Sequence, residues 1–329
     1  MSKMINGFIL VDAPYSALNN AGTDAGDSTD NIVRVKYIQK GRDRYPYVSG
    51  QALRYWWRET LEEKFDWNLS PISRETKIAF TAANPIDYED DDVFGYMRAL
   101  KKKDGGTVTR ISPLKNSPLV SIISQNPTND FGVMARHEGD PVPYEHEFYS
   151  TVLKGIFSLD LNSIGVFSSV EKTGYKNMYP ELEKIAEEKD LEKDENGNFI
   201  LNKEVRLKRT TDVIQVLPYL QGGAKLTSHL TDVVPKFIVL CVVNGGNHIF
   251  MNIAEEKEGK PYINFGAIDE YIEEYNDIIL TKVYIGVMEG FMNDLKSEIK
   301  DYYKNNDKIV IGTIKETVNN FSAELDGLM

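Results

Sequence analysis

The chain has 329 residues, 41% of them hydrophobic and 27% charged, with a formal net charge of −12; this composition is that of a globular protein and excludes a disordered or fibrous one. Its single cysteine, Cys241, excludes an intrachain disulfide and fits a reducing compartment. The first residues carry no signal-peptide pattern, and the longest apolar run, 237–243, is far shorter than the roughly 20 residues that a membrane-spanning helix needs, so we predict a cytoplasmic protein with no membrane partner.

The first part of the chain is predicted to form a strand, a polar excursion and a helix. Residues 4–12 are apolar and typical of a β-strand. Residues 13–48 contain so many Gly, Asp, Asn and Thr residues that part of them is predicted to be a mobile loop, with a hairpin arm at 32–38. Ser49 is the predicted cap of an amphipathic helix. The buried stripe of this helix consists of Leu53, Trp57, Leu61 and Phe65.

The rest of the chain alternates between shorter predicted strands and helices. Hydrophobic patterns and turn residues predict strands at 76–82, 118–124, 155–167, 237–243, 278–286 and 308–311. The same signals predict helices at 92–103, 178–194, 204–220, 268–275, 288–304 and 313–326. The segment 237–243 is apolar throughout, which predicts a buried strand.

The order strand, helix, strand, strand, helix, strand predicts a mixed α/β (α+β) fold with a ferredoxin-like or RNA-recognition core. We expect a single elaborated domain over residues 1–329. The core is predicted to comprise about 4–12, 49–82, 153–167 and 204–245. Insertions are predicted at about 13–48, 84–150 and 168–203, followed by an α/β tail at 260–329.

Charge is distributed unevenly along this chain. Residues 87–92 contain five acids and no base, and residues 181–195 contain eight acids against three lysines. By contrast, residues 34–58 contain seven basic residues and a single acid, Asp43. Because phosphate binding depends on the local field, the negative net charge does not exclude nucleic acid as a partner.

Residues 36–58 are the strongest candidate for such a binding surface. Their cations are Lys36, Lys40, Arg42, Arg44, Arg54 and Arg58. Ser49, Gly50 and Gln51 open the predicted helix, and a helix start offers unpaired N–H groups and a partial positive charge to a phosphate. Basic arms with aromatic rings such as Tyr37 and Tyr45 suit single-stranded nucleic acid, whose bases stack on the rings.

A second candidate is the loop after the helix predicted at 204–220. Consecutive Gly222 and Gly223, followed by Ala224, could expose backbone amides to a phosphate, with Lys225 as a point charge.

Both candidates have an ordinary structural alternative, and composition leaves it open. Arg54 and Arg58 could simply pair with Glu62 and Glu63 on a solvated helix face. The two glycines could be a helix C-cap followed by a turn.

Enzyme signatures are weak. The histidines, His137, His146, His229 and His248, are scattered and do not show metal-ligand spacing. No phosphate-binding or dinucleotide fingerprint is present. Asp24, Asp27 and Asp30 could hold Mg²⁺ or could belong to a solvated loop rich in turn-forming residues, and we favour the loop. We therefore predict no catalytic residue, no cofactor and no metal.

Several ordered motifs give this sequence a resemblance to a known family. They are VSGQALRYWWR at 48–58, DDVFGYM at 91–97, RISPLKNSPLVSI at 110–122, EFYSTVLKGIFSLDLNSIGVF at 147–167 and QGGAKLTSHLTDVVPKFIV at 221–239, with Asn19 and Asn20 after the first strand. Together they resemble the backbone proteins of Cascade, the Cas-seven family, and in particular the DevR branch of type I-B CRISPR systems.

The resemblance implies a modified RNA-recognition fold with finger, palm and thumb elaborations, the thumb being assigned to about 168–204. It implies a non-enzymatic subunit that binds CRISPR guide RNA, polymerises with further copies of itself and with other Cascade subunits, and meets target DNA through the guide. The RNA-binding residues would be Asn19, Asn20, Lys36, Arg42, Arg44, Ser49, Gly50, Gln51, Arg54, Arg58, Gly222, Gly223, Ala224 and Lys225.

Two other functions stay open at this point. Related backbone proteins of type III complexes cut RNA with a loop aspartate between the first strand and the first helix, so Asp24, Asp27 and Asp30 leave a metal-dependent RNA endonuclease possible. The DevR resemblance also leaves a DNA-binding transcriptional or developmental regulator possible, although the sequence shows no basic recognition helix.

Overall fold

A mixed sheet forms the centre of the protein in the computed structural model, which describes residues 2–22, 32–75, 78–101, 106–136, 138–172 and 175–329. In their order across the sheet, the main strands are β21 (Ile309–Gly312), β20 (Val283–Val287), β17 (Phe237–Asn244), β1 (Lys3–Ser16), β13 (Val142–Asp160), β11 (Leu119–Ser121), β5 (Asp43–Val48) and β4 (Tyr37–Lys40). The short strand β10 (Leu114–Asn116) also pairs with β13. The mixed α/β class predicted from the sequence is confirmed.

Four central strands and two helices follow the predicted order β1, α1, β11, β13, α4, β17. The helices are α1 (Gly50–Phe65) and α4 (Lys203–Gln215). Strand β1 lies between β13 and β17 and is antiparallel to both, and β11 is antiparallel to β13. A split β-α-β arrangement thus forms the middle of the sheet. Its closer assignment to an RNA-recognition fold stays a prediction.

Helices cover one side of the sheet, which we call the helix side. Alternate residues of β1 and β13, such as Ile9, Leu153 and Phe157, pack there against α1, α4 and α8 (Ile314–Glu324). Trp57 of α1 is fully buried in this core and meets the ring of Phe157 edge-on at 5.2 Å. Burying one such side chain contributes about 1.5–3 kcal/mol, so the predicted apolar stripe is what fixes α1 on the sheet.

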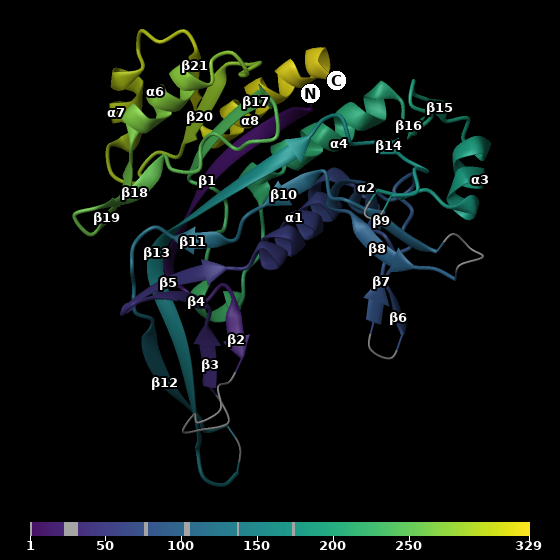
Figure 1. Ribbon diagram of the computed structural model, residues 1–329. Helices are drawn as coiled ribbons and strands as arrows, with labels where there is room; N and C mark the ends of the chain where they lie inside the picture. The colour runs from purple at the N-terminus through teal and green to yellow at the C-terminus, as the bar shows by residue number, and fades with distance from the viewer. Residues whose placement is uncertain (1, 23–31, 76–77, 102–105, 137, 173–174) are drawn as a thin grey trace.

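Part of the C-terminal tail covers the opposite side, which we call the tail side (Figure 1). Phe8 and Val239 pack there against α6 (Phe265–Glu274) and α7 (Leu295–Tyr302). Hairpin β18 (Ala254–Lys257) and β19 (Lys260–Ile263) lies at the border of this cover. An RNA-recognition sheet binds bases on an open face, and here the middle of that face is a hydrophobic core.

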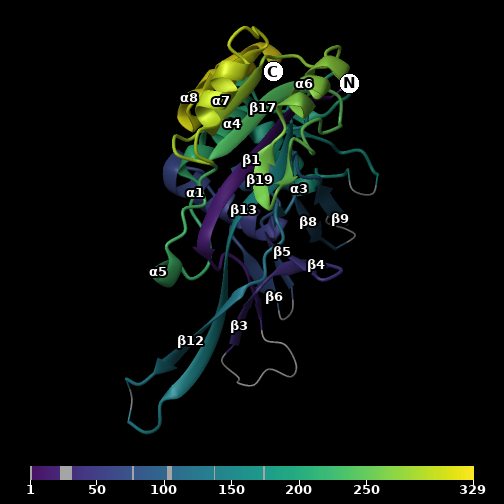
Figure 2. The same ribbon diagram turned by 90° about the vertical axis from the view of Figure 1, so that its left-hand side faces the viewer.

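A long β-stranded arm projects from the sheet in both views (Figures 1 and 2). It consists of β12 (Thr128–Met134) paired with the first half of β13, and of β3 (Ile32–Val35), which pairs in parallel with β13 at Glu145 and His146. Strand β2 (Asn20–Gly22) pairs with β3. The strand predicted at 155–167 is therefore correct only over the inner end of β13, because residues 161–165 form a turn.

A compact lobe lies at the other end of the molecule and has its own apolar core (Figure 1). Its elements are β6 (Ser73–Glu75), β7 (Ile78–Phe80), α2 (Glu89–Phe94), β8 (Tyr96–Ala99), β9 (Thr107–Arg110), β14 (Val166–Phe167), α3 (Pro180–Glu188), β15 (Glu192–Lys193) and β16 (Phe199–Ile200). The helix predicted at 92–103 is wrong, because α2 ends at Phe94 and Gly95, with φ +71°, turns the chain into β8.

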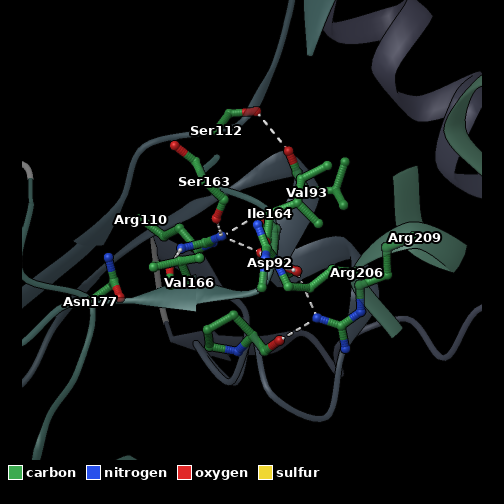
Figure 3. A network of polar contacts seen from close by, with 12 residues as sticks. Asp92, Val93, Arg110, Ser112, Ser163, Ile164, Val166, Asn177, Arg206 and Arg209 are labelled. Atoms are coloured by element: carbon green, nitrogen blue, oxygen red, sulfur yellow. Dashed lines mark hydrogen bonds and ion pairs between the residues drawn. The ribbon is translucent and has the colours of Figure 1, made fainter. Parts of the chain in front are cut away.

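Asp92 connects this lobe to the core (Figure 3). Its carboxylate pairs with Arg110 and, at 2.7 Å, with Arg209, and it accepts the Gly165 N–H at 3.0 Å. The Asp92 side chain has no exposed surface. The acidic run at 87–92 is thus largely part of the buried structure, because Asp90 and Asp91 are buried as well.

The remaining predictions for the second half hold in part. Helix α4 ends at Gln215 and passes into a short 3-10 turn (Leu217–Tyr219), followed by the single-turn α5 (Leu226–His229). Segment 237–243 is the buried strand β17, as predicted. The strand at 278–286 and the helix at 288–304 are shorter than predicted, as β20 and α7. Within the described ranges, no helix has both the length and the hydropathy needed to cross a bilayer.

Candidate nucleic-acid interface

The start of α1 is held by two side chains from outside the helix. Ser49 caps it, its Oγ accepting the Ala52 N–H at 3.3 Å. Asn19 in turn accepts the Ser49 N–H at 2.9 Å. Asn116 Nδ2 donates to the Gly50 carbonyl at 3.2 Å, and a Cβ on Gly50 would lie equally close to that nitrogen. Asn19 is thus a residue that positions the helix start, whereas its neighbour Asn20 is exposed in β2.

Two backbone N–H groups at this helix start form no hydrogen bond within the described part of the protein. The first helical bond runs from Leu53 N to Ser49 O, and the Ser49 hydroxyl takes the amide of Ala52. Among the described residues, the N–H groups of Gly50 and Gln51 have no protein acceptor. Such amides, at the positive end of a 16-residue helix, favour an anion.

Arg54 is committed to the protein interior. Its guanidinium donates to the carbonyls of Phe94 and Leu114 and to Ser112 Oγ, the last two at 2.8 and 3.0 Å, and also to Asn116 Oδ1. Burial, and then the charge of Arg58, lower the pKa of Arg54 to about 10. Arg54 therefore ties α1 to the segments beside it. Because protein acceptors occupy its guanidinium, no pair of free donors is left for the predicted RNA contact.

Arg58 has a different environment on the same helix. Its guanidinium lies over the Phe94 ring at 5.0 Å. Burial lowers the pKa of Arg58, while the charge of Asp90, first among several acids, opposes that shift. The simple alternative of pairing with Glu62 and Glu63 is wrong: within the described part of the chain Glu63 pairs with Lys64, and neither arginine pairs with these two glutamates.

The hairpin β4–β5 carries the other predicted cations. Arg44 lies over the Tyr37 ring at 4.6 Å and Lys40 over the Tyr45 ring at 4.9 Å. Arg42 is exposed at the turn, next to Asp43. No ion pair between these cations and a described acid is present, so their charges are available to a ligand.

The register places these cations on two different sides of the sheet. Leu119 and Leu153 belong to the helix-side core, and Leu119 pairs with Val48. Alternation along β5 therefore puts Arg44 on the helix side, together with the start of α1. Lys40, stacked on Tyr45, falls on the tail side. Lys36 pairs with Tyr47 and shares the side of Lys40 by the same register.

The glycine loop packs against α1 from the other flank. A Cβ on Gly222, whose φ is +154°, would lie 2.2 Å from the Trp56 ring, and one on Gly223 would lie 2.8 Å from Leu18. Gln221 N–H donates to Thr60 Oγ1 at 3.0 Å. The glycines are thus required by close packing, and the helix C-cap alternative is wrong because α4 ends earlier, at Gln215.

The outer wall beside this loop is acidic. A groove of about 590 Å³ runs between the loop and α1, and its α1 wall includes Glu59, Glu62 and Glu63. Carboxylates repel phosphate, so Gly222, Gly223 and Ala224 are weaker candidates than the helix start. Lys225 lines a different pocket, together with Tyr144 of the arm.

The base of the arm holds a polar cluster that the sequence does not indicate. His146 Nε2 lies 3.3 Å from the Asp130 carboxylate, and its ring stacks on Tyr144 and meets His229 edge-on at 5.6 Å between centroids. Burial, and then the charge of Lys225, lower the pKa of His146. Gly132 leaves room for the Tyr144 ring, because a Cβ there would lie 2.1 Å from it.

Asp24, Asp27 and Asp30 lie outside the described residues, as does most of the loop predicted to be mobile. Across the described ranges, no group of three or more His, Cys, Asp or Glu side chains is arranged to hold a metal ion.

Comparison with known proteins identifies the class of fold first. Two solved chains, from a "CRISPR RNA-guided surveillance complex" and from a "CRISPR RNA-guided surveillance complex, pre-nicking", are similar over 98% of this chain and 99% of theirs. The TM-scores are 0.53 and 0.58 at 8% and 11% identity, so the likeness is one of fold. No curated protein matches the sequence.

The family follows from the sequence itself. A family model, "CRISPR-associated negative auto-regulator DevR/Csa2", matches residues 11–264. The chain belongs to this family, which confirms the resemblance. The match ends just before α6, so the helices that cover the tail side lie beyond the matched region.

Proposed function

We propose that this protein is a guide-RNA-binding backbone subunit of a type I CRISPR surveillance complex. The observation that carries the proposal is the start of α1, where the amides of Gly50 and Gln51 lie free between the cations of hairpin β4–β5 and the loop that ends in Lys225. Leu18 and Asn19 join the two flanks, because Leu18 contacts Gly223 and Asn19 holds Ser49.

The chemistry of this surface suits sequence-independent RNA holding. Backbone amides, Arg44 and Lys225 contact phosphates and sugars, which position a strand without reading its bases. The exposed Arg42 extends the same cationic edge. Base pairing by the guide then reads the DNA target, so the protein itself needs no base-specific contacts.

The arm supplies the means of assembly in this proposal. It projects well beyond the sheet (Figure 2) and exposes Phe131 and Val133, whose exposed fractions are 73% and 61%. Apolar side chains so far from any core favour burial against a neighbour. A contact between the arm of one copy and the body of the next is heterologous and builds an open filament, which other subunits of the complex would cap. The thumb assignment at about 168–204 stays a prediction; this segment contributes side chains to the apolar core of the lobe.

The proposal includes no catalytic residue. The described surface around the helix start offers free amides and cations, which hold an anion in place, and we assign it a scaffold role. Incubating the assembled complex with complementary RNA and Mg²⁺ tests the endonuclease alternative: cleavage that Asp24→Ala, Asp27→Ala or Asp30→Ala abolishes would contradict a passive scaffold.

The experiment for RNA binding measures the RNA that co-purifies with the protein. We expect RNA of uniform length, and a several-fold lower RNA-to-protein ratio in Gln51→Glu and in Lys225→Glu, because each adds negative charge beside the phosphate path. The matched control is Lys304→Glu, a charge reversal at an exposed site just after α7. RNA content unchanged in both site variants would overturn the proposed surface.

The family description supplies a second candidate, a regulator that acts on its own expression. If that is the role of this chain, the purified protein without RNA binds DNA from upstream of its own coding sequence better than unrelated DNA of equal length. Equal binding to both DNAs at each salt concentration leaves the backbone function as the explanation.

A further inference from the structure

The tail side of the sheet has an uncovered end. The C-terminal tail packs over β1 and β17, but β11, β5 and β4 extend beyond it, and hairpin β18–β19 lies at the border (Figure 1). Val152 and Ile122 are the last core residues on this side. Residues farther along the same face are half-buried or exposed, so this part of the sheet is an open surface next to a closed one.

Two lysines and two tyrosines share this open surface, and we call them the tail-side strip: Lys40, Tyr45, Tyr47 and Lys154. Lys154 pairs with Val120, which pairs with Tyr47, so all three face the tail side. Tyr45 follows Tyr47 by two residues on β5 and carries Lys40 over its ring. Lys40 and Tyr45 belong to the stretch that the sequence already suggests for nucleic acid, but by register all four side chains face the tail side, away from the start of α1.

The two lysines of the strip form no ion pair with a described acid. Lys154 Nζ donates to the Ala254 carbonyl at 3.3 Å. Burial, and then the charge of Lys40, lower the pKa of Lys154. The charge of Glu255 on β18 opposes this shift, and its carboxylate also accepts a hydrogen bond from Asn264 Nδ2 at 3.1 Å. Asp43, opposite Lys40 in the hairpin register, is the other acid nearby.

We propose that the tail-side strip binds a single-stranded polynucleotide on a path separate from that of the guide at the helix start. The two ammonium groups lie on strands three spacings apart, each about 4.8 Å, and so suit different phosphates of one strand. Tyr45 and Tyr47 between them suit unpaired bases, because every base has a face that can stack on an aromatic ring. A duplex offers no such free faces, and the strip therefore selects a single strand.

In a complex that opens a DNA duplex, such a strand could be the displaced DNA strand or an unpaired part of an RNA. Both have the same phosphates and stacking faces, and the strip does not distinguish them. This inference rests on the proposed function only in one respect: a CRISPR surveillance complex is what brings such strands to the protein. The strip itself lies on the opposite side of the sheet from α1.

The first test measures how tightly fluorescent single strands, oligo-dT and oligo-rU of equal length, bind to the full chain purified with its RNA. In Lys40→Ala combined with Lys154→Met, which keeps the apolar stem of Lys154, we expect about tenfold weaker binding. The slope of log affinity against log salt should also become shallower by about 1.4, at roughly 0.7 per lost phosphate contact. Tyr45→Ala with Tyr47→Ala should weaken binding about tenfold without changing the slope, because stacking carries no charge.

The matched control is Lys257→Ala with Lys260→Ala on the neighbouring hairpin, which should leave the affinity unchanged. Co-purified RNA and the unfolding temperature should be unchanged in the strip variants, which separates a lost site from a lost fold. Unchanged affinity in both strip variants would overturn the proposal.

Ultraviolet crosslinking in the assembled complex identifies the source of the strand. Crosslinks from displaced DNA or from an unpaired RNA segment to residues 40–47 both support the strip, and they tell the two sources apart. If the lysine variant loses its co-purified guide RNA, the strip belongs to the guide path. The proposal of a separate path is then wrong, and the proposal that the protein binds guide RNA still stands. If Gln51→Glu and Lys225→Glu retain guide RNA but the strip still binds single strands, the proposed guide surface fails and this inference stands.

Discussion

The acidic run at 87–92 and the basic hairpin β4–β5 both stand out by charge in the sequence, but the fold treats their charges differently. Asp92 is fully buried and neutralised by Arg110 and Arg209, which come from distant parts of the chain. The hairpin cations Lys40 and Arg44 lie over ring faces, and no ion pair joins them or Arg42 to a described acid. The difference shows that a charged segment indicates function only when the rest of the fold leaves its charges unpaired.

The largest expected effect is at Asp92. Asp92→Ala leaves two buried arginines without their counter-charge, so we expect a loss of about 3–5 kcal/mol in the free energy of unfolding. Urea denaturation followed by circular dichroism measures it. The control is Asp87→Ala, which removes the partly exposed pair with Lys189 and should cost at most about 1 kcal/mol. Equal effects at the two positions would mean that the buried network is not what joins lobe to core.

The next effect concerns the glycine loop. Gly222→Ala places a Cβ 2.2 Å from the buried Trp56 ring, so we expect about 1–3 kcal/mol of destabilisation. Gly246→Ala, where a Cβ meets no atom within 4 Å, is the matched control. A stable Gly222→Ala protein that has lost its RNA would instead show that the glycine serves a ligand.

The smallest effect is a pH dependence at the base of the arm. Because the pKa of His146 is lowered on folding, its contribution to stability is fully present above the unfolded value of 6.5. It is lost as pH falls through 6.5 towards the lower folded pKa, since the unfolded chain then binds the extra proton. Titration of the His146 ring by NMR should show its pKa rising in Lys225→Ala, and an unchanged pKa would exclude Lys225 as the neighbouring charge.

The parts of the fold that depend on local pattern were predictable. The stripe through Leu53, Trp57 and Leu61 and the cap at Ser49 appear in α1 as expected, because both depend on residues close in sequence. The buried strand at 237–243 was equally clear from its composition. The outer half of β13 was missed, since its partners are other arm strands and its polar residues hide the alternation.

The candidate site was predictable only in outline. The helix start and the basic hairpin were found from residue type and capping rules, but the partners of Arg54 come from segments 94–116, which no local pattern relates to α1. The same holds for Lys154, which joins the hairpin cations only through sheet register. Distant pairing decides which charges stay free, and a sequence window does not contain it.

The central claim is that local cations hold phosphate on a protein whose net charge is −12. Affinity for a guide-length single-stranded RNA, measured over a range of salt concentrations, tests it most directly. We predict that log affinity falls linearly with log salt, and that Arg42→Ala with Arg44→Ala makes the slope shallower by about 1.4, at roughly 0.7 per lost phosphate contact. A slope near zero, or one that the double substitution leaves unchanged, would contradict phosphate holding by this surface.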